Sequence, residues 1–276
     1  MQIKAAVLRE VGAKMPYAES KPLKIESLEL DPPGPGELLV QVKAAGLCHS
    51  DLSVINGSRL RPTPMALGHE AAGIVKEVGI GVTRFSVGDH VVLVFVPSCG
   101  HCVPCAEGRP ALCEPGAAAN VAGTLVSGER RLHVDNGDVH HHLGVSAFAD
   151  HAVVSETSCV KVDSSLSFEE AALFGCAVIT GVGAVLNTAK VEPGSRVAVI
   201  GLGGVGLNSL LGAVVAGAKQ IVAIDLREDK LALARQLGAT DAVNASDENA
   251  IEAIRELTGG GVDYAFEMAG SVPALE

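Results

Sequence analysis

The chain has 276 residues, of which 48% are apolar and 3% aromatic, so it is long enough for one large or two ordinary domains with aliphatic cores. Its formal net charge of −11 argues against a broad phosphate-neutralising surface and therefore against a nucleic-acid partner. The opening residues, MQIKAAVLREVG, lack the long apolar core of a secretory leader, and seven cysteines without such a leader favour a reducing compartment, here the cytoplasm.

The first part of the chain, up to about residue 175, predicts a β domain. Extended runs such as LLVQVKAAG (38–46), AAGIVKEVG (71–79) and DHVVLVFV (89–96) are bounded by Gly, Pro and Asp. Short strands separated by such breakers are typical of mostly antiparallel sheets with long loops.

Two short stretches of this domain, GLCHSD (46–51) and LGHEAAGIV (67–75), suggest a metal site. Cys48 and His69 lie 21 residues apart, and Cys176 is the well-placed partner late in the chain. Two thiolates and one imidazole balance the charge of Zn²⁺ and leave one coordination position open for a reactant. Spacing does not establish that the three residues meet, and a single free cysteine is commonly a buried core residue.

The stretch SCGHCVPCAEGRPALC (98–113) contains four cysteines in the spacing C-x2-C-x2-C-x7-C, namely Cys99, Cys102, Cys105 and Cys113. Four thiolates at such spacing suit a closed, structural zinc site. An iron–sulfur cluster would place its fourth cysteine nearer, and disulfides conflict with a reducing compartment. The excess negative charge calls for backbone N–H groups and a cation, for which Arg109 is the candidate.

The HHH run (140–142) is interpreted as loop surface rather than a third metal site.

From about residue 178, apolar strands alternate with helical patterns. The predicted strands are 196–203, 220–226, 241–245 and 262–270, and the predicted helices are 204–218, 227–238 and 249–260. This alternation predicts a parallel sheet with helices on both faces, so the fold class is α/β. The uncharged stretch 197–218 has the length of a membrane span, but its clustered glycines favour a strand, turn and helix, and no membrane partner is expected.

The loop GLGGVG (201–206) follows a predicted strand and opens a predicted helix, and Asp225 follows 19 residues after its last glycine. These are the conditions under which G-x-G-x-x-G binds a dinucleotide, with the pyrophosphate at the helix N-terminus. The loop residues expected at the cofactor are Gly201, Gly203, Gly204, Val205 and Gly206. Asp225 would accept hydrogen bonds from an adenosine ribose and repel a 2′-phosphate, which favours NAD over NADP, although Arg227 weakens that preference.

Together, the GHEAAGIVKEVGIGV stretch (68–82), the four-cysteine loop and GLGGVG closely resemble the zinc-containing alcohol dehydrogenases of the medium-chain dehydrogenase/reductase superfamily. The resemblance implies a GroES-like catalytic domain over 1–177, with a structural zinc lobe at 97–115. A Rossmann NAD-binding domain then covers 178–276 and ends after its fourth strand. Family members continue further, and the complete chain is expected to form a homodimer or homotetramer.

The resemblance also assigns roles. Cys48, His69 and Cys176 match the catalytic zinc ligands, Glu70 a nearby acid, and Asp51 the carboxylate that holds His69. Ser50 matches the hydroxyl that accepts the alcohol proton. Residues expected at the cofactor are His49 at the pyrophosphate, Thr180 and Val205 at the nicotinamide, and Lys230 near the ribose. Residues expected around the substrate are Phe95, His142 and Leu143.

The implied reaction is zinc-dependent oxidation of an alcohol to an aldehyde or ketone, with hydride transfer to NAD⁺. The alternatives are a polyol or amino-alcohol dehydrogenase, an S-(hydroxymethyl)glutathione dehydrogenase, or a non-catalytic NAD- and zinc-binding protein. Two features depart from the family pattern. Ser53 stands where many relatives end the proton relay on histidine, and Arg59 and Arg61 replace acids typical of the glutathione-dependent branch.

Overall fold

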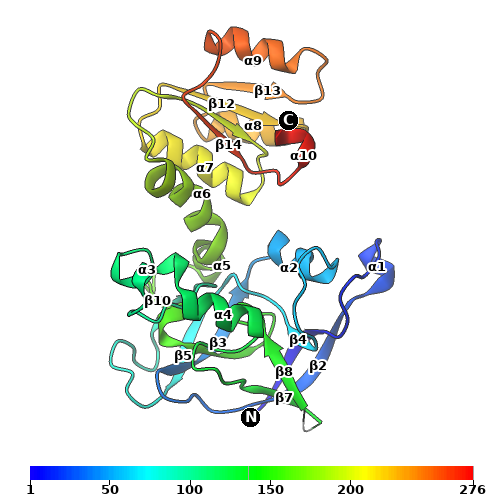
Figure 1. Ribbon diagram of the computed structural model, residues 1–276, viewed down its shortest axis with the longest axis vertical. Helices are drawn as coiled ribbons and strands as arrows, with labels where there is room; N and C mark the ends of the chain where they lie inside the picture. The colour runs from blue at the N-terminus through cyan, green and yellow to red at the C-terminus, as the bar shows by residue number, and fades with distance from the viewer. Residues whose placement is uncertain (136, 276) are drawn as a thin grey trace. The chain divides into compact units, whose positions relative to one another are not determined.

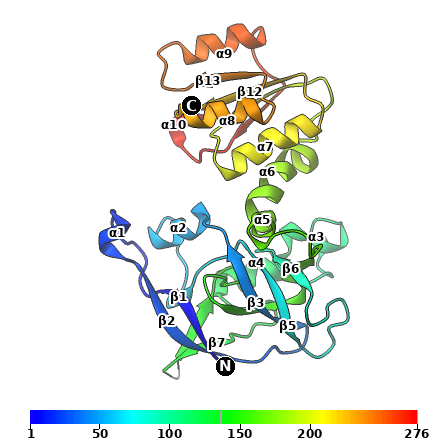
Figure 2. The same cartoon turned by 180° about the vertical axis from the view of Figure 1, so that it is seen from behind.

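The computed structural model describes residues 1–135 and 137–275, and the chain divides into two compact units that meet between Cys176 and Ala177. The first unit is dominated by β-strands and the second alternates strands with helices, as the labels in Figures 1 and 2 show from opposite sides.

The first unit contains a closed barrel and a five-stranded sheet. The barrel has the order β1 (Gln2–Leu8), β2 (Leu23–Leu30), β7 (Leu132–Val134), β8 (Gly137–His141) and β4 (Met65–Ala66). The sheet has the order β10 (Cys159–Lys161), β6 (His90–Leu93), β5 (Ala71–Val78), β3 (Glu37–Ala45) and β9 (His151–Ser155). Every named pair in this unit is antiparallel except β4 with β8, so the predicted mostly antiparallel domain is confirmed.

Strand β3 links the two cores of this unit. Its residues Leu38 and Val40 pack in one buried cluster with Leu93 and Val154, while Leu39 packs in another with Leu28. This is the period-two alternation of a strand buried on both faces. The strand is therefore a rigid support for β5, which pairs with it directly after the His69–Glu70 segment.

The helices of the first unit are short. They are α1 (Tyr17–Ser20), α2 (His49–Ile55), α3 (Val103–Ala106), η1 (Pro110–Leu112), α4 (Glu114–Ala122), η2 (Glu156–Ser158) and α5 (Phe168–Leu173). Helix α5 begins at an N-cap serine: the Ser167 hydroxyl accepts the Glu170 backbone N–H and donates to the Glu170 carboxylate.

The helical run continues past α5 through η3 (Phe174–Val178), α6 (Ile179–Gly183) and η4 (Ala184–Ala189), and both η segments are π-helical. The whole run, Phe168–Ala189, has 22 residues, and an 18-residue stretch within it has a mean hydropathy of 1.7, which fits a membrane span by length and composition. That is weak support for a span, since a core helix of a globular domain has the same properties.

The second unit contains a four-stranded parallel sheet in the order β13 (Asp241–Asn244), β12 (Gln220–Asp225), β11 (Arg196–Ile200) and β14 (Tyr264–Glu267). Its helices are α7 (Gly204–Val215), α8 (Glu228–Gln236), α9 (Ala250–Thr258) and α10 (Val272–Leu275). The stretch 197–218 therefore forms a strand, a turn and a helix, as predicted, and not a single span.

The sheet of this unit is covered by helices on both faces. Leu210 of α7 and Leu231 of α8 share a cluster with Val197 and Val199, whereas Ala250 of α9 shares a different cluster with Ala198. Neighbouring residues of β11 point to opposite faces, so α7 and α8 cover one face and α9 the other. The predicted doubly wound α/β arrangement is confirmed.

Candidate active site

Three residues far apart in the sequence meet in the first unit. Cys48 precedes α2, His69 precedes β5, and Cys176 lies in the π-helical turn η3. The two sulfur atoms are 3.8 Å apart, and the ligand atoms of all three residues lie within 4.8 Å of one another. Cys48 is half-buried and the other two are buried. The cluster therefore gathers two sulfurs and one imidazole, the donor set that the sequence suggested.

The His69 ring is held from behind by Asp51 of α2. Its Nδ1 lies 2.9 Å from Asp51 Oδ2, which leaves Nε2 as the free donor atom. The other carboxylate oxygen, Oδ1, accepts the Gly68 backbone N–H at 2.9 Å and lies 3.0 Å from His142 Nδ1. Burial raises the pKa of Asp51, but the contacts with His142 and His69 outweigh it, so the carboxyl pKa lies well below its usual range. Asp51 is thus a buried carboxylate that orients two imidazoles.

The charges around the cluster favour a thiolate at Cys48 and positive charge close to it. Contact with Cys176 lowers the pKa of the Cys48 thiol to about 3, with His69 and the Ser50 backbone acting in the same direction. Burial lowers the pKa of His69, but Asp51 and Cys48 raise it, and it lies at about 9. A thiolate and a carboxylate therefore stabilise positive charge at this point. The donor set and the free Nε2 fit a zinc ion with three protein ligands and one open position.

The neighbouring predicted residues differ in exposure. Glu70 is buried, and Gly46 approaches it so closely that a Cβ on Gly46 would lie 2.9 Å from the Glu70 carboxyl carbon. Ser50 is partly buried and His49 is exposed, both in the first turn of α2. The Ser53 hydroxyl donates to the His49 carbonyl at 3.0 Å. The Ser53 hydroxyl therefore donates its hydrogen bond within its own helix, α2.

Two of the three predicted substrate residues flank His69. The rings of Phe95 and His142 stand edge-on to the His69 ring, with centroids 5.7 and 5.5 Å away. Leu143 is buried and has a left-handed backbone, with φ of 54°. All three lie in the first unit, and His142 is fully buried with its Nδ1 at Asp51, so its ring is fixed in place.

The interpretation of the HHH run as loop surface was wrong. His140 and His141 belong to strand β8, and His141 and His142 are buried. His141 Nε2 accepts the Arg131 backbone N–H at 3.1 Å, and burial lowers the pKa of His141 to about 3, so the ring is neutral. Arg130 Nε donates to His140 Nδ1 at 3.1 Å, and His142 Nδ1 lies at Asp51, contacts that the run itself does not reveal.

The four cysteines of the 98–113 loop also converge, with their sulfurs within 4.8 Å of one another. Backbone N–H groups point at these sulfurs. The N–H groups of Cys99 and Gly116 donate to Cys113 Sγ at 3.2 and 3.3 Å, and that of Cys102 donates to Cys99 Sγ at 3.3 Å. Backbone donors led by that of His101 lower the pKa of Cys99 to about 6. This donor set fits a closed tetrahedral zinc site.

Two other features of the cysteine chemistry can be read from the structure. The guanidinium of Arg109, expected to balance the four thiolates, pairs with the Glu107 carboxylate two residues away. Cys159, in β10, lies outside both clusters, and burial raises the pKa of its thiol. A buried, protonated thiol of this kind is chemically inert.

The glycine loop of the second unit connects β11 to α7, as predicted. Gly201 has φ of 88°, and a Cβ there would lie 2.6 Å from the Ala269 backbone nitrogen. A Cβ on Gly206 would lie 1.8 Å from the Gly201 carbonyl oxygen, so this glycine lets the helix approach the strand. A Cβ on Gly203 would meet no atom within 4 Å, which leaves open space where a pyrophosphate would lie.

A cavity of about 270 Å³ opens at the carboxyl ends of the parallel strands, with Asp225 in its wall. Asp225 Oδ2 accepts the Leu202 N–H at 2.7 Å and Oδ1 accepts the Arg227 N–H at 3.0 Å. The Arg227 side chain pairs with Asp229. Thr180 is exposed, Lys230 and Val205 are partly buried, and all three belong to this unit. Ligands of open α/β sheets bind at this edge.

Two family models match the chain. The alcohol dehydrogenase GroES-like domain matches residues 34–164, and the zinc-binding dehydrogenase model matches residues 204–276. A solved structure from Burkholderia ambifaria, an alcohol dehydrogenase zinc-binding domain protein, is 40% identical with a TM-score of 0.91, over 100% of this chain and 72% of that chain. The chain belongs to the zinc-containing alcohol dehydrogenase family. The resemblance stated from the sequence is thereby confirmed.

Two further structures are similar to this chain. Benzyl alcohol dehydrogenase from Acinetobacter calcoaceticus is 38% identical, with a TM-score of 0.90, over 100% of this chain and 72% of that one. A protein from Sinorhizobium meliloti 1021, described as a zinc-binding dehydrogenase and bound to NADP, is 28% identical, with a TM-score of 0.78 over the same shares. The chain is accordingly an oxidoreductase of a zinc- and nicotinamide-dependent family.

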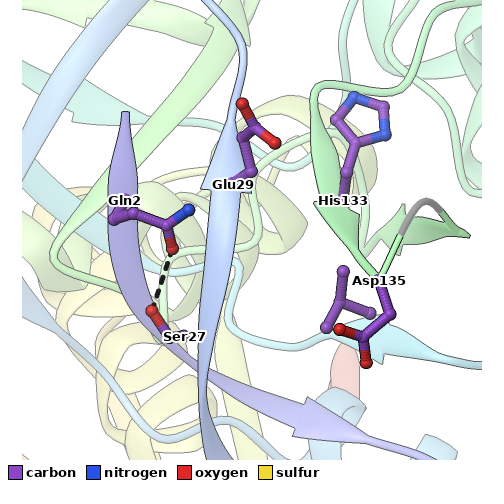
Figure 3. A pocket seen from close by; sticks show the side chains of 6 residues that line it. Gln2, Ser27, Glu29, His133 and Asp135 are labelled. Atoms are coloured by element: carbon purple, nitrogen blue, oxygen red, sulfur yellow. Dashed lines mark hydrogen bonds between the residues drawn. The ribbon is translucent and has the colours of Figure 1, made fainter.

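The chain has another cavity, of about 410 Å³, at the barrel of the first unit. Figure 3 shows its walls, which are Gln2, Ser27, Glu29, His133, Val134 and Asp135. The Ser27 hydroxyl donates to Gln2 Oε1 at 3.0 Å across one wall. None of the residues assigned from the sequence lines it.

Sequence reasoning missed part of both sites. It did not find the contact between Asp51 and His142, for which the sequence carries no signal. It also missed Ala269 and Ser271, which line the cavity beside the glycine loop. Those two follow β14, and the rule that ligands bind beyond the carboxyl ends of parallel strands would have found them.

Proposed function

We propose that the chain catalyses the reversible oxidation of an alcohol to an aldehyde or ketone, with NAD⁺ as hydride acceptor. The observation that carries this proposal is the convergence of Cys48, His69 and Cys176 on one point, with Asp51 behind the histidine. Three ligands of this kind leave one position for a reactant, whereas a purely structural zinc site is closed.

Cys48, His69 and Cys176 would hold a zinc ion, which would supply Lewis-acid chemistry toward the hydroxyl of a bound alcohol. The chain's own residues do the rest. Asp51 fixes the tautomer and orientation of His69, and the Ser50 hydroxyl takes up the alcohol proton and passes it outward. Ser53 cannot serve as a titrating base, so the proton leaves to water or to another base. Phe95 forms an apolar wall beside His69.

The dinucleotide is proposed to bind the second unit at the glycine loop and the adjoining cavity. The free N–H groups at the start of α7 and the open space at Gly203 suit a pyrophosphate. Two carboxylate oxygens of Asp225 have acceptor capacity left for ribose hydroxyls. We favour NAD because Asp225 repels a 2′-phosphate and Asp229 holds the Arg227 guanidinium. His49, Thr180, Val205 and Lys230 are proposed to contact the cofactor.

The remaining assignments follow the same reasoning. The four-cysteine site is proposed to hold a second, structural zinc that braces residues 97–115. The domains are proposed to divide at residue 177. The partner is a small-molecule alcohol or aldehyde, the compartment is the cytoplasm, and the complete chain is proposed to form a homo-oligomer. Similarity to benzyl alcohol dehydrogenase makes aromatic primary alcohols the first substrates to test.

The test is an NAD-linked turnover screen over aromatic, primary aliphatic, secondary, polyol and amino alcohols, with S-(hydroxymethyl)glutathione included. We expect turnover of an apolar alcohol, abolished by Cys48→Ala, and a zinc content of two per chain. Turnover that survives Cys48→Ala would refute the assigned metal site. One zinc per chain and no turnover of any alcohol would instead favour a non-catalytic zinc- and NAD-binding protein.

A further inference from the structure

The π-helical turn that carries Cys176 approaches strand β6 very closely, and the residue at the point of approach is Gly175. A Cβ built on Gly175 would lie 2.4 Å from the backbone oxygen of Leu93 and 3.5 Å from a methyl carbon of Val92. Ordinary contacts between a carbon and a carbonyl oxygen are about 3.3 Å or longer. The turn can therefore occupy its place only because residue 175 has no side chain.

The partner surface cannot easily move away. Leu93 is fully buried and is paired on both sides, with Ala71 of β5 and with Cys159 of β10. Displacing its carbonyl would disturb the pairs that β6 forms with β10 and β5 in the five-stranded sheet. A side chain at residue 175 would therefore move the helical turn rather than the strand.

The same face of the helical run is built from small residues. Ala171 and Ala172 of α5 pack against Ala72 and Val92, and Gly175 follows four residues after Ala171. Residues at this spacing lie on one face of a helix. Helix α5 and the start of the turn after it therefore lie close to the sheet, and the tight approach at Gly175 is one residue before Cys176.

Strand β6, which Gly175 approaches, also pairs with the strand that follows the ligand His69. Leu93 pairs with Ala71, which begins β5 two residues after His69. The strand pair that anchors His69 is thus the surface that Gly175 touches. Cys176 follows directly, with its sulfur 3.8 Å from that of Cys48.

We propose that Gly175 is a positioning residue for the metal site: its missing side chain lets the π-helical turn rest on the Leu93 carbonyl, and this contact sets where the Cys176 sulfur lies. The inference rests on the proposed function in taking Cys176 as a zinc ligand. A Cβ would push the turn outward by about 1 Å. Metal–ligand distances tolerate only about 0.2 Å, so the displacement would weaken the site.

The variant Gly175→Ala tests this proposal, and two glycines of the same helical run provide controls. A Cβ on Gly181 would lie 2.3 Å from the Val205 carbonyl oxygen and 2.7 Å from the Ser209 nitrogen, a clash at least as severe as that at Gly175. A Cβ on Gly183 would meet only a side-chain nitrogen of Asn187 at 3.9 Å. Gly181→Ala thus controls for strain in the run, and Gly183→Ala for the substitution itself.

The measurements are zinc content, zinc affinity by chelator competition, and the cobalt–thiolate absorption of Co²⁺-substituted protein. In Gly175→Ala we expect the four-cysteine zinc to remain, the affinity of the other site to fall about 10- to 100-fold, and its cobalt spectrum to change. Gly181→Ala should melt at a lower temperature with an unchanged cobalt spectrum, and Gly183→Ala should match the parent chain.

The outcomes separate this inference from the proposed function. A parent chain with a single zinc, at the four-cysteine site, would contradict the proposed function and the inference with it. A parent chain with two zincs and a Gly175→Ala variant with the parent's affinity and cobalt spectrum would overturn the inference alone. A Gly175→Ala chain that fails to fold, or a Gly181→Ala chain that loses the same zinc, would also overturn it, because the role would then be general packing.

Discussion

Replacing Asp51 with asparagine tests the support behind the proposed zinc ligand. Three nitrogens face this carboxylate: His69 Nδ1 at Oδ2, and His142 Nδ1 and the Gly68 N–H at Oδ1. An amide has one oxygen and one NH₂ group, so it can accept on one side only. The better arrangement keeps its oxygen toward the two nitrogens at Oδ1, and its NH₂ group then faces His69.

The expected effect follows from that loss. Removing the partner that holds a metal-bound histidine typically lowers metal affinity or activity by about 10- to 100-fold. This corresponds to about 1.4 to 2.8 kcal/mol of binding free energy. Asp51→Asn should therefore weaken zinc binding at the three-ligand site by that factor and reduce NAD-linked turnover, while the four-cysteine site keeps its zinc.

The assay is competition for zinc against a chromophoric chelator, with turnover measured at saturating zinc. Glu37→Gln is the matched control, because Glu37 is equally buried and accepts from Gly34, Ser127 and Arg131, outside the three-ligand cluster. It should lower the melting temperature and leave zinc affinity at the three-ligand site unchanged. Parent-like zinc affinity and turnover in Asp51→Asn would refute the reasoning.

Four further outcomes are expected. Partial burial lowers the pKa of His133, but the flanking carboxylates raise it overall, so its stabilising charge is complete below pH ~6.5 and is lost as pH rises through the raised pKa. His133→Gln should remove this pH dependence from thermal melting; an unchanged dependence would contradict it. Cys113→Ser should cost one zinc and lower the melting temperature, and full zinc retention would argue against a closed four-thiolate site. Ser53→His should add a step near pH ~6.5 to the turnover profile, whereas an identical profile would count against the proposed relay. Asp225→Ala should raise NADP turnover relative to NAD, and an unchanged ratio would remove the basis for the NAD preference.

Much of the fold could be predicted because its signals are local. The alternation of strands and helices after residue 178 and the glycine loop depend on nearest neighbours along the chain. For the same reason, the four cysteines within the 98–113 loop identified their own cluster. Arg109 was expected to balance the charge of the four thiolates, but its guanidinium forms an ion pair with Glu107, two residues away. That acidic neighbour is equally visible in the sequence.

The three-ligand cluster was harder to predict because its members come from separate elements. Spacing nominated Cys48, His69 and Cys176, but only the resemblance to a family gave reason to join them. The burial of His142 and the fit of Gly175 depend on partners in α2 and β6, which no local pattern contains. The HHH run was misread for this reason: three polar residues in sequence look solvent-exposed unless their distant partners are known.

The position of Cys159 has a practical consequence for work on this protein. Six of its seven cysteines belong to the three-ligand and four-cysteine clusters. The seventh, Cys159, is buried in β10, and burial raises the pKa of its thiol. Alkylating reagents attack thiolates that are accessible and unligated. Labelling of the folded chain, resolved by peptide mass, should therefore report metal loading: label at Cys48, which is only half-buried, reports that the three-ligand site is empty, and label at the 98–113 loop reports that the four-cysteine site is empty.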